Sequence, residues 1–301
     1  MVMNGNPTVI SLFAGCGGST LGYKMAGFKE LLAIDNDRNS VDTFRLNFKI
    51  EIWQKDIKTI SADEILKFCK INTGELDVLD ASPPCQGFSL AGKFEINDTR
   101  NDLFYELSRL VKELKPKVFL MENVAGQIKG KMKGKFNEIY KELSSLGYKL
   151  KVKLMNSQYY QVPQARERII FIGTRQDLKK EPTFPSASLE TISVRQAFER
   201  VENKTFYKGK ITERQIKDRL AWDRPAPVLL NTANSIRGSC VVHPEENRHL
   251  TIEEAKRLCS FPDRFKLTGT FNQQWARLGN AVMPNFMKAI ALNIKNNILN
   301  G

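Results

Sequence analysis

The strongest constraint on the fold is a regular alternation of short apolar runs with amphipathic helical patterns, from residue 8 to about residue 175. This alternation is typical of a doubly wound α/β sheet, in which each helix returns the chain to the next parallel strand. The expected strands cover residues 8–13, 31–34, a short run before Asp56, 76–81, 118–121, 149–156 and 168–174. We expect the last two to form an antiparallel edge of the sheet.

Helical periodicity separates these strands. The expected helices cover residues 19–26, 40–48, 62–69, 102–114 and 136–146, with Gly147 as a stop after the last of them. A further helix over 251–259 begins with Thr251, and Glu254 three residues later predicts a capping box. The final helix, 285–298, is apolar on one face, so we expect it to pack back on the domain that these strands and helices form.

The alternation stops near Arg175. From there to about Asn247 the chain is rich in proline, lysine and arginine and has no clear period. We therefore predict two units. Residues 1–175, completed by 276–301, would form a catalytic and cofactor-binding domain, and 176–275 would form a smaller, irregular unit with its connection.

The composition narrows the class of protein. The formal net charge of +13 over 301 residues favours a polyanionic partner, although a lysine-rich solvated surface is the alternative. No apolar run approaches the roughly 18 residues of a membrane span, and the N-terminus lacks the pattern of an export signal. Five cysteines without a CxxC pair and two histidines argue against a disulfide framework and a zinc site. We expect a cytoplasmic protein that binds no metal.

Three successive strand ends carry groups that suit an adenosine-containing cofactor. The glycine-rich turn Phe13-Ala-Gly-Cys-Gly-Gly18 follows the first strand, and glycine lets the backbone approach a ligand closely. Asp35 ends the second strand and can accept both hydroxyls of a ribose. Asp56-Ile57 follows the third strand and can meet an adenine amino group. The turn does not match the GxGxxG pattern, which disfavours a dinucleotide.

The segment Pro83-Pro84-Cys85-Gln86 follows the fourth strand, and Glu122 ends the fifth. Each proline fixes φ and lacks a backbone N–H group, so the turn that presents the thiol is stiff. A cysteine at one strand end with a carboxylate at the next can attack a ring carbon and protonate the ring. A lone cysteine is otherwise a small buried apolar residue, but this context favours a nucleophile.

In their order along the chain, these segments resemble the bacterial and phage cytosine-C5 DNA methyltransferase family. The segments that carry the resemblance are FAGCGG (13–18), Asp35, Asp56-Ile57, PPCQGFS (83–89), ENV (122–124), QARER (164–168), RHLTIEEAKRLCSFPDRF (248–265) and RLGNAVMP (277–284). They span the chain apart from roughly residues 176–240. The resemblance implies a Rossmann-like, S-adenosylmethionine-dependent methyltransferase sheet with a small, irregular target-recognition domain.

The resemblance also implies roles for individual residues. Cys85 would add to C6 of a flipped cytosine, so that C5 can take the methyl group, while Glu122 would act at N3 and the N4 amino group. Arg168, with Arg166, would hold the base or support the thiolate. The residues expected to bind the cofactor are Phe13, Ala14, Gly15, Cys16, Gly17, Gly18, Asp35, Asn36, Asp56, Ile57, Pro84, Leu103, Asn280 and Val282. The residues expected to contact DNA are Gln86, Ser89, Arg100 and Gln164.

The implied partner is double-stranded DNA, bound by a monomer associated with the nucleoid, in restriction-modification or epigenetic marking. A cognate restriction endonuclease would be a separate protein that does not bind the chain. Arg214, Lys217 and Arg219 fall at helical spacing in the irregular unit, and we expect them to contact phosphates. Two alternatives stay open: a tRNA cytosine-C5 methyltransferase on the same scaffold, and a catalytically inactive DNA-binding subunit.

Overall fold

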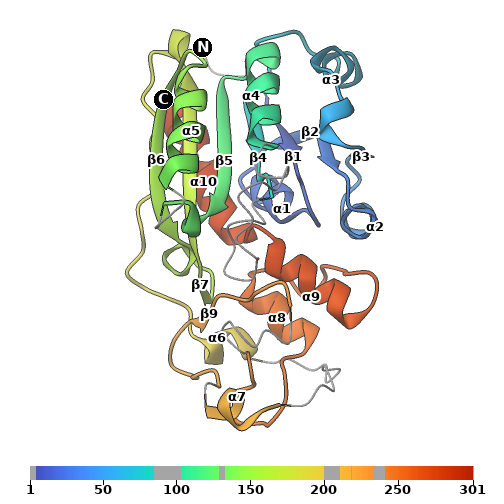
Figure 1. Cartoon of the computed structure of the whole chain (residues 1–301), viewed down its shortest axis with the longest axis vertical. Coiled ribbons are helices and arrows are strands. Elements are labelled where there is room, and N and C mark those ends of the chain that lie inside the picture. The colour runs from blue at the N-terminus through green and yellow to red at the C-terminus, as the bar shows by residue number, and fades with distance from the viewer. Residues whose placement is uncertain are drawn as a thin grey trace.

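The computed structural model describes residues 5–84, 103–128, 133–199, 211–217, 219–232 and 241–300. Its centre is a seven-stranded sheet (Figure 1). The strands are β1 (Thr8–Leu12), β2 (Lys29–Asp35), β3 (Ile52–Gln54), β4 (Val78–Ala81), β5 (Val118–Val124), β6 (Tyr148–Asn156) and β8 (Glu167–Arg175). Their order across the sheet is β3-β2-β1-β4-β5-β8-β6.

The pairing confirms the predicted doubly wound sheet. β1 pairs in parallel with β2 and β4, and the flanking pairs β2–β3 and β4–β5 are also parallel. β8 runs antiparallel to both β5 and β6, which is the antiparallel edge that the sequence predicts. A separate two-stranded parallel sheet joins β7 (Gln164–Ala165) to β9 (Ala226–Pro227).

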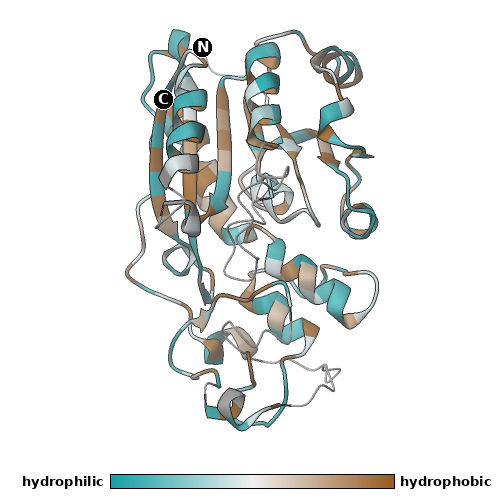
Figure 2. Cartoon of the chain, viewed as in Figure 1, coloured by the Kyte–Doolittle hydropathy of each residue, from teal (hydrophilic) through white to brown (hydrophobic). Residues whose placement is uncertain are grey.

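Helices cover both faces of the central sheet. One face packs against α1 (Gly18–Met25), α2 (Arg38–Asn47) and α10 (Pro284–Ile294), and the other packs against α3 (Ala62–Cys69), α4 (Leu103–Leu114) and α5 (Lys133–Ser144). Alternate residues of one strand enter different cores, as Val9 and Ile10 of β1 do. Figure 2 accordingly shows brown along the sheet and teal on the outer side of α4 and α5.

The expected helix boundaries hold to within a few residues. The helix over 62–69 has those bounds, whereas the one expected to reach 146 ends at Ser144, and Gly147 takes a positive φ of 76° three residues later. α8 (Ile252–Leu258) begins with the predicted capping box, in which Thr251 and Glu254 exchange side-chain-to-backbone hydrogen bonds of 3.0 and 2.8 Å. α10 packs against α1, as expected, and continues into one π-helical turn, Lys295–Leu299.

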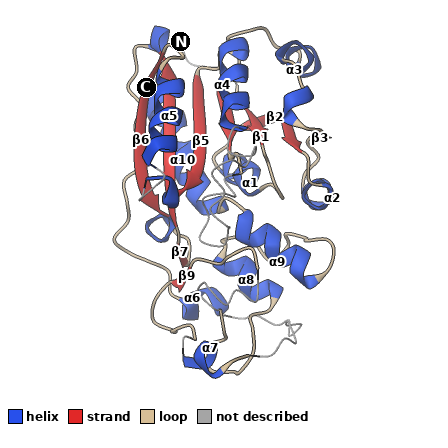
Figure 3. Cartoon of the chain, viewed as in Figure 1, coloured by secondary structure: helices blue, strands red, loops and turns tan. Residues whose placement is uncertain are grey.

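Below the sheet, the C-terminal part of the chain gathers α6 (Val194–Phe198), α7 (Glu213–Lys217), α8 and α9 (Phe271–Asn280) among long loops (Figure 3). Leu258 of α8 and Trp275 of α9 belong to the same apolar core as Met287 of α10 and Val9 of β1. The lower helices are therefore packed onto the α1 side of the sheet. Within the described ranges, no helix is long and apolar enough to cross a membrane.

Candidate active site

In the glycine-rich turn after β1, two glycines are tightly packed and a third borders open space. A Cβ atom on Gly17 would lie 2.3 Å from the ring of Phe48, and one on Gly18 would lie 2.1 Å from the carbonyl oxygen of Val282. Gly17 and Gly18 are thus required for close packing. Gly15 has a φ of 56°, and a Cβ atom there would meet nothing within 4 Å. The backbone at Gly15 therefore borders open space, as a cradle for a ligand requires.

Asp35, at the end of β2, fastens this turn. Its Oδ2 atom accepts a hydrogen bond from the Gly15 N–H group at 2.8 Å, and its Oδ1 atom accepts one from the Asp37 N–H group at 2.8 Å. Burial raises the pKa of Asp35, and these two N–H groups oppose that rise. A carboxylate oxygen can accept a second hydrogen bond, so Asp35 can hold the turn and still bind ligand hydroxyls.

The segment that follows β3 is hydrogen-bonded to α4. Asp56 is exposed and caps a short 3-10 turn by accepting from the Lys58 N–H group at 3.0 Å, whereas Ile57 is buried. Arg109 of α4 donates to the carbonyl oxygens of Ile57 and Ile60 at 3.2 and 2.9 Å. Sequence reasoning did not single out Arg109, because an arginine on a helix face is usually solvated.

The other residues expected at the cofactor lie around the same edge. Leu103 is the first residue of α4 and is half-buried, while Asn36 follows β2 and is exposed. Asn280 ends α9 with an exposed side chain, and Val282 packs on the turn at Gly18. An adenosine-type cofactor fits this position. Gly15 borders open space, the Asp35 carboxylate can accept from ribose hydroxyls, and Leu103 offers a half-buried apolar surface.

Glu122 and Arg168 meet at the carboxyl end of β5. Their Oε1 and Nε atoms are 2.6 Å apart, and both side chains are largely buried. In the antiparallel pairing Glu122 lies opposite Ile170, so Arg168 is its diagonal neighbour on the same face. Burial lowers the pKa of Arg168, and the adjacent Glu122 carboxyl group opposes that change. The structure thus joins two residues that the sequence predicts to be catalytic.

Asn123 ties the turn before Cys85 to the end of β5. Its Nδ2 atom donates to the carbonyl oxygen of Pro83 at 3.3 Å, and its Oδ1 atom accepts from the Val124 N–H group at 2.7 Å. This contact was not foreseen, and its only signal in the sequence was a polar residue beside Glu122 at a strand end. Four other predicted residues lie outside the described ranges, namely Cys85, Gln86, Ser89 and Arg100.

Arg166 and Gln164 are buried in the scaffold. Arg166 donates to the carbonyl oxygens of Leu229 and Gly279 at 3.2 and 2.8 Å. Gln164 accepts from the Leu229 N–H group at 3.2 Å and donates to the Leu258 carbonyl oxygen at 3.4 Å. Their polar atoms therefore join β7 to the C-terminal helices. The catalytic role of Arg166 and the DNA contact of Gln164 stay predictions, and this burial does not favour the DNA contact.

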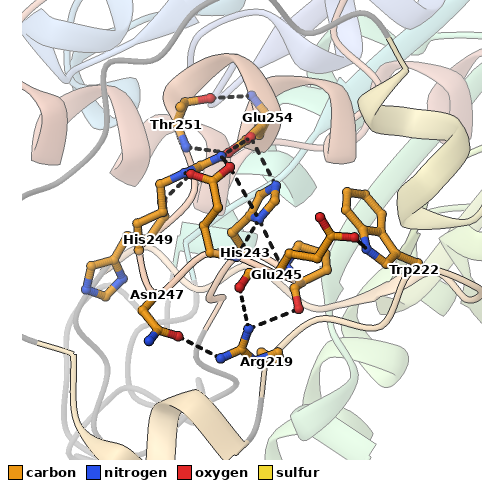
Figure 4. Close-up of polar contacts among 11 residues, drawn as sticks. Arg219, Trp222, His243, Glu245, Asn247, His249, Thr251 and Glu254 are labelled. Carbon is orange, nitrogen blue, oxygen red and sulfur yellow. Dashed lines mark hydrogen bonds and ion pairs between the residues drawn. The ribbon is translucent and has the colours of Figure 1, made fainter.

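Arg219 lies beyond the described helix α7, and its expected phosphate contact stays a prediction. α7 ends at Lys217, and the Arg219 guanidinium donates to the carbonyl oxygens of Pro244 and Glu245 at 3.1 and 2.9 Å. It also donates to Asn247 Oδ1 at 2.7 Å (Figure 4). These bonds fasten the loop over 243–249. They also use guanidinium donors that a phosphate contact would need.

The same loop is anchored on α8. Arg248 donates to both carboxylate oxygens of Glu254 at 2.8 Å, which is a bidentate ion pair. His243 Nδ1 accepts from the Glu246 N–H group at 3.1 Å, and burial lowers the pKa of His243. The loop is therefore held by charge pairing and by a histidine that serves as an acceptor.

The fold, with a glycine-rich turn at the carboxyl end of β1 and carboxylates at those of β2 and β5, defines a Rossmann-like α/β protein whose candidate site lies at the strand ends. The sequence profile of the family described as C-5 cytosine-specific DNA methylase matches residues 7–224 and 221–296. The chain belongs to this family.

Individual relatives agree with this assignment. The chain is 35% identical to the type II methyltransferase M1.HphI of Haemophilus parahaemolyticus, over 94% of this chain and 85% of the relative. It is 32% identical to M.Sau96I of Staphylococcus aureus, over 97% of this chain and 76% of the relative. A prophage-encoded E. coli protein described as a DNA modification methyltransferase superposes with a TM-score of 0.81 at 25% identity, covering 98% of this chain and 100% of that one.

Proposed function

We propose that this chain transfers a methyl group from S-adenosylmethionine to C5 of a flipped cytosine in double-stranded DNA, at a specific sequence, as the modification enzyme of a restriction-modification pair. The observation that carries the proposal is the buried Glu122–Arg168 pair, tied through Asn123 to the turn that leads to Cys85. Family membership and the type II names of the relatives support DNA as substrate. They do not favour the tRNA methyltransferase or the inactive subunit.

The cofactor site would be formed at the ends of β1, β2 and β3. Gly15 and Asp35 would bind the ribose end, and Asp56 with Ile57 would bind the adenine. Val282 would close the site from the side of α9. S-adenosylmethionine bound there would supply an electrophilic methyl group.

The chemistry of the chain's own groups follows from the electronic structure of cytosine. C5 is a poor nucleophile, so the Cys85 thiolate would first form a bond to C6 and push electron density toward C5 and N3. Glu122 would donate a proton to N3 as that charge develops, and Arg168 would keep the carboxyl group turned toward the ring. After C5 is methylated, its proton leaves to a base, the S–C6 bond breaks and N3 returns its proton to Glu122.

The two predicted units would have separate roles. Residues 1–175 with 276–301 would carry out the chemistry, and 176–275 would read the target sequence. The loop over 243–249 supports this division, because Arg219 bonds to its backbone and Glu254 of α8 pairs with its Arg248. A rigid loop can present side chains to base edges at a constant position.

The test is methylation of duplex DNA by the purified chain, mapped by bisulfite sequencing. Cys85→Ser should abolish turnover and leave cofactor binding nearly intact, because a serine alkoxide is far harder to generate. Cys69→Ser, on α3, is the matched control and should retain activity. Wild-type protein should also become trapped on DNA that contains 5-fluorocytosine. Methylation by Cys85→Ser above a trace, or methylation of tRNA in place of DNA, would overturn the proposal.

A further inference from the structure

Arg166 joins the strand that carries Arg168 to two distant segments of the chain. It is 4% exposed and lies just before β8. Its Nη1 atom donates to the Leu229 carbonyl oxygen at 3.2 Å, and its Nη2 atom donates to the Gly279 carbonyl oxygen at 2.8 Å. Leu229 belongs to the predicted target-recognition unit, and Gly279 lies in the last turn of α9, beside Asn280. Both terminal nitrogens are therefore bonded to the backbone of other segments.

The segment over 226–231, which includes one of these carbonyl groups, is held on two sides. Its first residues form β9, which pairs in parallel with β7 between the sheet and the lower helices (Figure 1). Further along, Trp275 Nε1 donates to the Leu230 carbonyl oxygen at 3.0 Å. The backbone of α9 approaches so closely that a Cβ atom on Gly279 would lie 2.5 Å from the same oxygen. The segment thus offers Arg166 a fixed acceptor.

The backbone of Arg166 is fixed as well as its side chain. Its N–H group donates to Asn156 Oδ1 at 3.1 Å, and its carbonyl oxygen accepts from the Ser157 N–H group at 3.0 Å. The chain then continues directly into β8, where the Arg168 Nε atom lies 2.6 Å from Glu122 Oε1. A shift of Arg166 would therefore move the backbone that carries Arg168.

These two side-chain contacts suit a guanidinium group in particular. Arginine presents its N–H groups in a planar fork and can bind two separate acceptors at once, whereas the lysine ammonium group is a point charge on a flexible stem. The two acceptors, Leu229 and Gly279, are 63 and 113 residues away in the sequence. Arg166 thus brings three parts of the chain together at one buried point.

We propose that Arg166 is a positioning residue for methylation, which ties β8 to the backbone at Leu229 and Gly279 and thereby fixes Arg168 against Glu122 without touching the cytosine. This inference rests on the proposed function of the same site. It gives the two arginines different roles: Arg168 acts at the base with Glu122, and Arg166 acts through Arg168. The predicted target-recognition unit and the catalytic pair consequently share one fixed contact.

The experiment is a double-mutant cycle on single-turnover methylation of duplex DNA by the full chain, with S-adenosylmethionine and DNA at saturation. Arg166→Lys keeps the charge and loses the fork. We expect it to lower the wild-type rate by about tenfold or more, because misplacing a reacting group by about 1 Å can cost about a hundredfold. In an Arg168→Lys background the same substitution should lower the rate by about twofold or less, because the guanidinium that Arg166 positions is absent.

A second readout separates positioning from binding. The Kd values of Arg166→Lys for S-adenosylmethionine and for duplex DNA should each stay within about twofold of wild type, because the lost interaction acts on the rate at saturation. If Arg166→Lys does not fold, Trp275→Phe takes its place in the cycle. It removes the donor to the Leu230 carbonyl oxygen and keeps an aromatic ring, so it loosens the same segment more gently.

Arg175→Lys is the matched control. Arg175 is the last residue of β8, and its Nη1 atom donates to the Gly74 carbonyl oxygen at 2.9 Å and also to the Lys115 carbonyl oxygen. It therefore joins the same strand to two distant carbonyl groups, but at the end away from Glu122. Its substitution should lower the Tm and leave the single-turnover rate within about twofold of wild type.

The outcomes separate this inference from the proposed function. Equal rate losses in the wild-type and Arg168→Lys backgrounds would overturn it, because Arg166 would then act independently of Arg168. A weaker Kd for DNA with an unchanged rate at saturation would also overturn it, and so would an equal rate loss in Arg175→Lys. Each of these results leaves the function standing. A wild-type chain that does not methylate cytosine in duplex DNA would overturn both.

Discussion

Replacing Glu30 by glutamine should make the stability of this protein less sensitive to pH. Glu30 lies on β2, and the Thr20 hydroxyl donates to its Oε1 atom at 3.0 Å. Its Oε2 atom is shielded from solvent and receives no hydrogen bond from the described residues. Burial raises the pKa of Glu30 to about 8, the hydroxyls of Ser11 and Thr20 oppose the rise, and Asp80 adds to it.

The direction and the size of the effect follow from that pKa. In the unfolded chain a glutamate titrates at about 4.3, so the folded state holds this proton more tightly. The stability that Glu30 contributes is fully present below about pH 4 and is lost as the pH rises to about 8. At about 1.4 kcal/mol per pKa unit the full loss is about 5 kcal/mol, an upper limit because water and relaxation soften burial. The amide of the Glu30→Gln variant cannot ionise, so the variant would escape this loss.

The assay is urea unfolding of wild type and Glu30→Gln at about pH 5, 7 and 8.5. The free energies of unfolding should differ by only about 1 kcal/mol near pH 5. The difference should grow to several kcal/mol in favour of the variant near pH 8.5. Glu51→Gln, at an exposed glutamate just before β3, is the control and should follow wild type. A difference between wild type and Glu30→Gln that stays constant with pH would refute the reasoning.

Three other substitutions test the site and its support. Gly18→Ala should destabilise the fold by about 1–3 kcal/mol in thermal unfolding and weaken cofactor binding, because its Cβ atom would lie 2.1 Å from the Val282 carbonyl oxygen. Thr251→Ala should cost about 1 kcal/mol in the same assay, since the Glu254 N–H group loses its cap. Asp35→Ala should weaken S-adenosylmethionine binding by about 1–3 kcal/mol in calorimetry; unchanged affinity would place the ribose contact elsewhere.

The order and type of the elements that build the central sheet were readable from the sequence. Apolar periods of two and of 3.6 residues are local properties, so the strands of the sheet and the helices between them were predicted to within a few residues. The capping box at Thr251 was equally local. The family could be recognised because its motifs stand at strand ends, where parallel strands bring them to one edge.

The contacts of Arg219 show what a local sequence pattern does not predict. The sequence places Arg214, Lys217 and Arg219 at helical spacing, but Arg219 lies beyond the described helix α7. The guanidinium then bonds to carbonyl oxygens of a loop about two dozen residues later, at Pro244 and Glu245. A charge pattern predicts that a residue is basic, but it does not predict which partner from a distant segment will occupy its donors.

The sequence by itself determined that the chain forms a doubly wound sheet and which residue types stand at its strand ends. Only the tertiary structure decided how those residues are paired: Glu122 with Arg168 across β5 and β8. The reason is that strand order and register, which depend on contacts between distant segments, determine which side chains share a face. Burial then shifts the proton equilibrium of Glu30, because an apolar interior penalises charge.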